Sequence, residues 1–140
     1  MDYDSKAKNI IFIQHLCHSL PAANGKKEHI MQVLLNLLNN AVDACNEVGG
    51  SHEVTITTEV LNAEILITVA DNGCGIESKY MDKINDPFFT TKAVGKGTGL
   101  GLSICHTLVE NQGGGLTIDS EKNSGTSVFI TLPIPAQTVL

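Results

Sequence analysis

The chain has 140 residues, 42% of them hydrophobic, so we expect one globular domain over residues 1–140 and exclude a disordered chain. Its formal net charge is −6 and all nine basic residues are lysines, which disfavours nucleic-acid binding. The four cysteines lack the spacing of a zinc site or a disulfide framework, and no segment reaches the roughly 20 apolar residues that span a bilayer. We therefore expect a cytoplasmic domain without membrane contact, although a longer protein containing it can still be membrane-anchored.

The polar residues 1–9 are interpreted as a linker or leader, such as an excised piece of a longer protein would have. Residues 10–16 predict a strand and residues 21–27 a loop. A long helix is then predicted over residues 28–47. At 100° per residue its apolar side chains cover a wide sector, which indicates a mostly buried helix. They are Ile30, Val33, Leu34, Leu35, Leu37, Leu38, Ala41, Val42 and Ala44.

The rest of this helix is a polar stripe at i, i+3/i+4 and i+7 spacings. A solvated face is the ordinary explanation. However, each asparagine costs roughly half a kcal/mol of helix propensity relative to alanine, and three fall within five residues. Amide oxygens suit a hard cation such as Mg²⁺, and Asn36 and Asn40 lie one turn apart, so we favour a face toward metal and phosphate. The stripe comprises His29, Gln32, Asn36, Asn39, Asn40, Asp43 and Glu47.

Two strands follow, predicted by alternation over residues 54–60 and 65–69 and joined by a turn at Asn62-Ala63. The second strand leads into Asp71-Asn72-Gly73-Cys74-Gly75-Ile76, so a carboxylate lies at the mouth of a buried strand. Burying an ionised carboxylate is costly unless donors reach it, and the exocyclic amine of adenine is such a donor. The two glycines allow a flat ligand to approach the backbone closely. The alternative is an ordinary Asx turn, which Asp-Asn-Gly commonly forms.

Residues 77–98 are polar and too long for an ordinary connection, so they are interpreted as a lid, mobile without ligand from Lys79 to Lys96. Four lysines lie there, which leaves a local anion site open, and one ring of Phe88-Phe89 is expected to anchor in the core. A glycine run, residues 95–101, then precedes a helix predicted over residues 100–112. Such backbone before a helix N-terminus presents free N–H groups to an anion.

This glycine run fits neither of two familiar alternatives. A Walker A loop requires Ser or Thr after its lysine, whereas Gly97 follows Lys96. A dinucleotide fingerprint requires G-x-G-x-x-G after a first strand, and the spacing here is different. The chain closes with a strand over residues 116–120, a turn at Ser124-Gly125-Thr126 and an alternating strand over residues 128–133.

Five stretches, taken in chain order, resemble in turn the N, G1, F, G2 and G3 boxes of the catalytic ATP-binding domain of sensor histidine kinases. This domain belongs to the gyrase, Hsp90, histidine kinase and MutL (GHKL) superfamily. Asn-Asn-Ala-Val-Asp-Ala and Phe-Phe-Thr-Thr-Lys are similar to the nitrogen-regulation type in particular. The resemblance covers nearly the whole chain. The stretches are Asn36-Leu37-Leu38-Asn39-Asn40-Ala41, Asp71-Asn72-Gly73-Cys74-Gly75, Pro87-Phe88-Phe89-Thr90-Thr91-Lys92, Gly97-Thr98-Gly99-Leu100-Gly101-Leu102 and Gly125-Thr126.

The resemblance implies an α/β fold, a two-layer α/β sandwich (Bergerat fold) in which helices cover one face of a mixed sheet, with an ATP lid. It implies ATP and Mg²⁺ as cofactors. Asp71 would bind the adenine amine, helped through water by Thr126. Asn36 and Asn40 would face Mg²⁺ and the phosphates, and Asn36 and Lys92 would be catalytic. The other implied nucleotide-binding residues are Gly73, Gly75, Ile76, Phe89, Thr90, Lys96, Gly97, Thr98, Gly99, Leu100 and Gly101.

Three functions from different classes are compatible with these residues: a kinase module, an ATP-hydrolysing clamp, and a nucleotide-sensing module without chemistry. The clamp ATPases carry a glutamate at the position of Asn36 to activate water, and an amide is no general base, so the kinase is favoured. Two features depart from the family. The chain has no arginine in the lid and has Asp43 where many relatives have a basic residue, so Lys92 would carry more of the γ-phosphate interaction.

None of the five histidines lies in the His-Glu-x-x-x-Pro motif of a phosphoacceptor. The resemblance places the acceptor on a separate dimerisation domain of the same kinase, with a response regulator downstream. Transfer of the γ-phosphoryl group requires the acceptor nitrogen in line with the γ-phosphorus. We therefore expect this chain alone to bind nucleotide without taking up the phosphoryl group. The histidines, each expected to be structural or solvated, are His15, His18, His29, His52 and His106.

Overall fold

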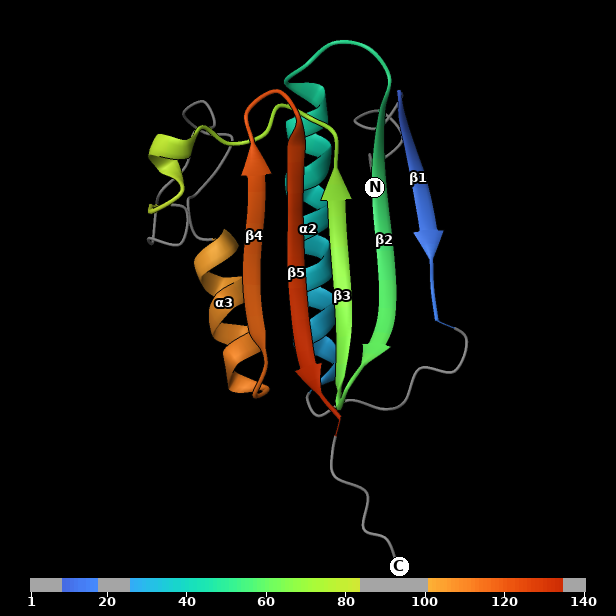
Figure 1. Cartoon of the computed structure of the whole chain (residues 1–140), viewed down its shortest axis with the longest axis vertical. Coiled ribbons are helices and arrows are strands. Elements are labelled where there is room, and N and C mark those ends of the chain that lie inside the picture. The colour runs from blue at the N-terminus through green and yellow to red at the C-terminus, as the bar shows by residue number, and fades with distance from the viewer. Residues whose placement is uncertain (1–8, 18–25, 84–100, 135–140) are drawn as a thin grey trace, which may run out of the picture.

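Among the residues that the structure describes, a five-stranded mixed sheet forms one layer and two α-helices form the other (Figure 1). The structure is a computed structural model and describes residues 9–17, 26–83 and 101–134. The strands run in the spatial order β1-β2-β3-β5-β4. In chain order the elements are β1 (Ile10–His15), α2 (Lys27–Asn46), β2 (His52–Leu61), β3 (Glu64–Asp71), the 3₁₀ turn η1 (Ser78–Tyr80), α3 (Gly101–Asn111), β4 (Gly115–Glu121) and β5 (Gly125–Pro133).

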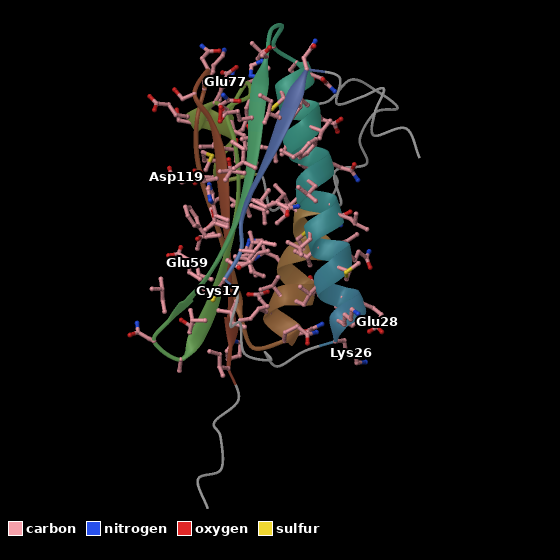
Figure 2. The ribbon with its side chains drawn as sticks, turned by 90° about the vertical axis from the view of Figure 1, so that its right-hand side faces the viewer. Cys17, Lys26, Glu28, Glu59, Glu77 and Asp119 are labelled. Atoms are coloured by element: carbon pink, nitrogen blue, oxygen red, sulfur yellow. The ribbon has the colours of Figure 1, made fainter. Side chains whose placement is uncertain are left out.

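The sheet is mixed because β1 runs parallel to β2, while the other neighbouring strands are antiparallel. Both α-helices lie on the same side of it, as the side view in Figure 2 shows. The predicted α/β sandwich, with helices on one face of a mixed sheet, is therefore confirmed. No helix among the residues that the structure describes is long and apolar enough to cross a membrane.

The core lies between the two layers. Alternate residues of each strand point to the helices, which is why the central strands carry an apolar residue at every second position. The helices contribute one apolar side each, and the shared cluster comprises Val33, Leu37, Ala41, Cys45, Val54, Ile65, Ile67, Val69, Cys105, Val109, Leu116, Val128, Ile130 and Leu132.

Helix α2 begins one residue before the predicted start and ends one before the predicted end, but it is less buried than its composition indicates. Leu35, assigned to the buried sector, is 47% exposed, and Met31 is 52% exposed. Cys45, outside the predicted sector, is buried instead. The reason is that the sheet and α3 cover only part of the helix circumference, so the edge of a wide apolar sector stays in solvent.

Both hairpin turns contain an asparagine with positive φ, a conformation that asparagine tolerates better than most residues. Asn62 has φ 55 in the β2–β3 turn, at the predicted position. The second turn is earlier than predicted: Asn123 has φ 70, and Gly125 already begins β5. Thr126 is therefore a strand residue with fixed cross-strand partners, not a turn residue.

Candidate functional site

Four residues form a row across four strands at one end of the sheet. Val54 on β2 is opposite Asp71 on β3, Asp71 is opposite Thr126 on β5, and Thr126 is opposite Ser120 on β4. Residues directly opposite each other share a face of the sheet. Val54 is fully buried under the helices, so the polar members Asp71, Thr126 and Ser120 also lie on the helix side. The helix-facing side of the sheet is therefore polar at this end, directly beside the apolar core.

The carboxylate of Asp71 is held by backbone donors. The N–H of Gly73 donates to its Oδ1 at 2.9 Å, so the Asx turn that the sequence offered as an alternative is present. Burial nevertheless raises the pKa of Asp71, while hydrogen bonds from the backbone of Gly73 and Thr126 and the charge of His52 act in the opposite direction. A carboxylate has about four acceptor sites, so this group can still accept a proton donor from a ligand.

The glycines beside Asp71 are required by packing, and their roles in nucleotide binding stay predictions. A Cβ on Gly73 would lie 2.5 Å from the carbonyl carbon of Ala44 in α2. A Cβ on Gly75, whose φ is +70, would collide with the backbone of Glu121 at the end of β4. The turn is wedged between α2 and the β4–β5 hairpin, and the space on these two sides is already occupied.

Hydrogen bonds fasten the turn to both neighbours. The N–H of Cys74 donates to the carbonyl of Ala44 at 3.1 Å, and the N–H of Asn123 donates to the carbonyl of Cys74 at 2.7 Å. Beyond the turn, Lys122 pairs with Glu77 at 3.1 Å. Glu77 also pairs with Lys79 at 3.5 Å, so the charge of Lys79, counted among the four lysines of the proposed anion site, is directed toward that carboxylate.

Ser120 is a site residue that the sequence analysis missed. Its hydroxyl accepts the N–H of Ile76 at 2.8 Å and donates to the carbonyl of Gly125 at 3.0 Å. It also lies 2.7 Å from the hydroxyl of Thr126. The strand was predicted to end at residue 120, but a single serine at a strand end carries no signal that distinguishes it from a solvated one.

His52 joins the loop after α2 to the glycine turn, which confirms the expectation of a structural histidine. Its Nε2 lies 3.0 Å from the carbonyl of Val48 and 3.2 Å from that of Gly49, and its Nδ1 lies 3.2 Å from the carbonyl of Asn72. Desolvation lowers the pKa of His52, but these carbonyl hydrogen bonds outweigh it and the pKa is raised. Both ring nitrogens face acceptors, and only the imidazolium can donate from both.

Asn36 and Asn40 lie half-buried on the side of α2 that faces α3. The side-chain nitrogen of Asn36 is 3.8 Å from Sγ of Cys105, a buried residue of α3. Because the nitrogen is directed at that sulfur, the amide oxygen points elsewhere and can serve as a hard-cation ligand. Amide oxygens of this kind fit Mg²⁺ when phosphates and water supply the other ligands.

Gly101 begins α3, which starts one residue later than predicted and presents its N-terminus at the end of the glycine run. The remaining predicted nucleotide ligands lie outside the described residues and stay predictions, as does most of the lid. They are Phe89, Thr90, Lys92, Lys96, Gly97, Thr98, Gly99 and Leu100. The Phe88-Phe89 anchor also lies outside them.

A sequence profile of the family described as histidine kinase-, DNA gyrase B- and HSP90-like ATPases matches residues 25–136. The chain belongs to this family. Within it, the chain is 40% identical over 124 residues to sporulation kinase D of Bacillus subtilis (strain 168), covering 89% of this chain and 24% of that protein. It is 39% identical over 127 residues to the signal transduction histidine-protein kinase AtoS of Escherichia coli (strain K12), covering 90% and 20%.

Among solved structures, the nucleotide-free catalytic domain of histidine kinase ThkA matches with a TM-score of 0.77 at 32% identity, covering 94% of this chain and 84% of that one. The chain thus spans most of that catalytic domain but only about a fifth to a quarter of the length of the two kinases named above. The sensory histidine kinase/phosphatase NtrB of Azospirillum brasilense also matches, 34% identical over 142 residues and covering 91% of this chain and 34% of that protein, which gives the nitrogen-regulation subtype weak support.

Proposed function

We propose that this domain binds Mg·ATP and donates the γ-phosphoryl group to a histidine on the dimerisation domain of the same kinase, as the first step of two-component signalling. The observation that carries the proposal is Asp71, a partly buried carboxylate with acceptor capacity left after its two backbone donors. Family membership supports the same conclusion, since relatives with matching sequence include proteins named histidine kinases.

In this proposal Asp71 accepts the adenine amine and Thr126 assists through water. Asn36 and Asn40 hold Mg²⁺, which would neutralise phosphate charge, and Lys92 contacts the γ-phosphate. The N-terminus of α3 and the glycine run before it bind the phosphates. A clamp-type ATPase is the weaker candidate, because the amide of Asn36 cannot take a proton from water. A response regulator would receive the phosphoryl group afterwards.

We place this activity in the cytoplasm, where ATP is available and thiols stay reduced. The four cysteines are all free in the structure, which suits a reducing compartment.

The decisive binding experiment is calorimetry with ADP, ATP and GTP, with and without Mg²⁺. Guanine presents a carbonyl where adenine presents its amine and would set an acceptor against Asp71. Asp71→Ala should weaken ADP binding by about ten- to a hundredfold, because it removes a charge-assisted hydrogen bond of about 1.5–3 kcal/mol. Asp119→Ala is the matched control, since this exposed β4 carboxylate lies on the sheet side away from the helices (Figure 2). Equal affinity for ATP and GTP would contradict the proposed base site.

The transfer reaction is tested with ATP labelled at the γ-phosphate. The chain alone should bind nucleotide without taking up label, and label should appear on the dimerisation domain when that domain is added in trans. Acid-labile phosphate on the isolated 140-residue chain would show that it carries its own acceptor. Rapid release of inorganic phosphate without an acceptor would favour the clamp-type ATPase.

A further inference from the structure

The hydroxyl of Ser120 is the point at which three parts of the base end of the site meet. It contacts the backbone N–H of Ile76 after the glycine turn, the carbonyl of Gly125 at the start of β5, and the hydroxyl of Thr126. The three distances are 2.8, 3.0 and 2.7 Å, all within the normal range for hydrogen bonds. One side chain thus joins β4, β5 and the segment that follows Asp71.

These three contacts use the whole hydrogen-bonding capacity of the serine. A hydroxyl has one proton to donate and two lone pairs. The carbonyl of Gly125 can only accept, and the N–H of Ile76 can only donate, so both contacts have a fixed direction. Rotation of the Ser120 hydroxyl would break at least one of them, and the partner beside it, Thr126, is therefore held in one side-chain orientation.

We propose that Ser120 is a positioning residue for recognition of the 6-amino edge of adenine. It acts through Thr126, whose hydroxyl it holds at 2.7 Å, and through Ile76, whose backbone it fastens beside the base site. The inference rests on the proposed function, because it assigns Ser120 to the adenine end of that site. Asn36 and Asn40 lie on α2, whereas this network joins β4, β5 and the segment after β3, so the phosphate end is not expected to depend on it.

The test compares ADP with inosine 5′-diphosphate, which has a carbonyl in place of the 6-amino group, by calorimetry. Ser120→Ala should weaken ADP binding by about tenfold and inosine diphosphate binding by less than about threefold, so that base selectivity falls. Ser120→Thr keeps the hydroxyl and should retain the wild-type preference for ADP over inosine diphosphate. Ser127→Ala is the matched control, because Ser127 is the next residue after Thr126 and points to the opposite face of β5.

A purely structural serine would give a different result. It would weaken both nucleotides equally, and that outcome would overturn the proposal. In the transfer reaction with the dimerisation domain, Ser120→Ala should raise KM for ATP and leave kcat unchanged, since the reacting phosphate is remote from this row. A reduced kcat with unchanged KM would likewise overturn it.

Two further variants keep the proposal testable if Ser120→Ala does not fold. Ser120→Cys has a similar size but a weak donor and acceptor, and it should lose selectivity as the alanine variant does. Thr126→Val removes the group that Ser120 positions, so Ser120→Cys should change selectivity little in that background. A full additional loss there would show that Ser120 does not act through Thr126. If wild-type protein binds neither nucleotide, the proposed function fails, and this result is distinct from equal losses in the variants.

Discussion

Replacing Gly73 with alanine tests the conclusion that packing against α2 requires a glycine in this turn. The new Cβ would lie 2.5, 2.6 and 2.7 Å from three backbone atoms of Ala44 and Cys45, well short of the 3.4 Å at which ordinary contact begins. These atoms belong to a helix and cannot rotate away, so the turn and α2 must separate by several tenths of an ångström.

The expected loss has two parts. Overpacking of this kind costs about 1–3 kcal/mol, and the separation also weakens the Cys74-to-Ala44 hydrogen bond, whose contribution is about 0.5–1.5 kcal/mol. The free energy of unfolding should therefore fall by about 2–4 kcal/mol. For a domain of this size that lowers Tm by about 5–15 °C.

Thermal and urea unfolding, followed by circular dichroism, measure this loss. Gly49→Ala is the matched control, because a Cβ at Gly49 meets no atom within 4 Å. Its Tm should be unchanged or slightly higher, since alanine restricts the unfolded chain. If Gly73→Ala unfolds at the same temperature as Gly49→Ala, the close approach of the turn to α2 is wrong.

Three other predictions concern charge and the lid. Because burial raises the pKa of Asp71, the ionised carboxylate is disfavoured in the ligand-free fold. Asp71→Asn should therefore keep or raise Tm at neutral pH, while it weakens ADP binding by about tenfold. A lower Tm of this variant would contradict the prediction. The pKa of His52 is raised above 6.5, so the stabilisation of the fold by its protonated ring is complete below the unfolded pKa and is lost as pH rises through the folded pKa. Wild type should therefore lose Tm relative to His52→Gln as pH rises from about 6 to 9. Parallel curves of Tm against pH for the two proteins would refute this. Hydrogen exchange over residues 79–96 should slow with saturating Mg·ATP, and unchanged exchange would refute the lid assignment.

Local patterns predicted most of the fold because each element carries a periodic signal. Alternation located β2 and β3, and the hairpin turn between them falls where Asn62 takes a positive φ. The extent of burial on α2 was less predictable. A wide apolar sector does not show how far the neighbouring layer reaches around the helix, and Leu35 is exposed for that reason.

The candidate site was predicted only where a residue type is unusual for its position. A carboxylate after an apolar strand and asparagines inside a helix are unusual, so Asp71, Asn36 and Asn40 could be proposed as site residues. Ser120 and His52 were not assigned a specific role, because their importance comes from partners 44 and 20 residues distant in the chain. Such partners are known only when the strand order is known.

The position of β5 also determines when the site can form. In chain order this strand is the last of the described sheet, yet it lies between β3 and β4, which have no direct pairing with each other in that sheet. A growing chain that has not yet produced residues 125–133 therefore cannot align Asp71 with Ser120, however well its earlier elements have formed. A nucleotide that depends on this row therefore cannot stabilise a chain that lacks β5, because the row is complete only after β5 has paired with both of its neighbours.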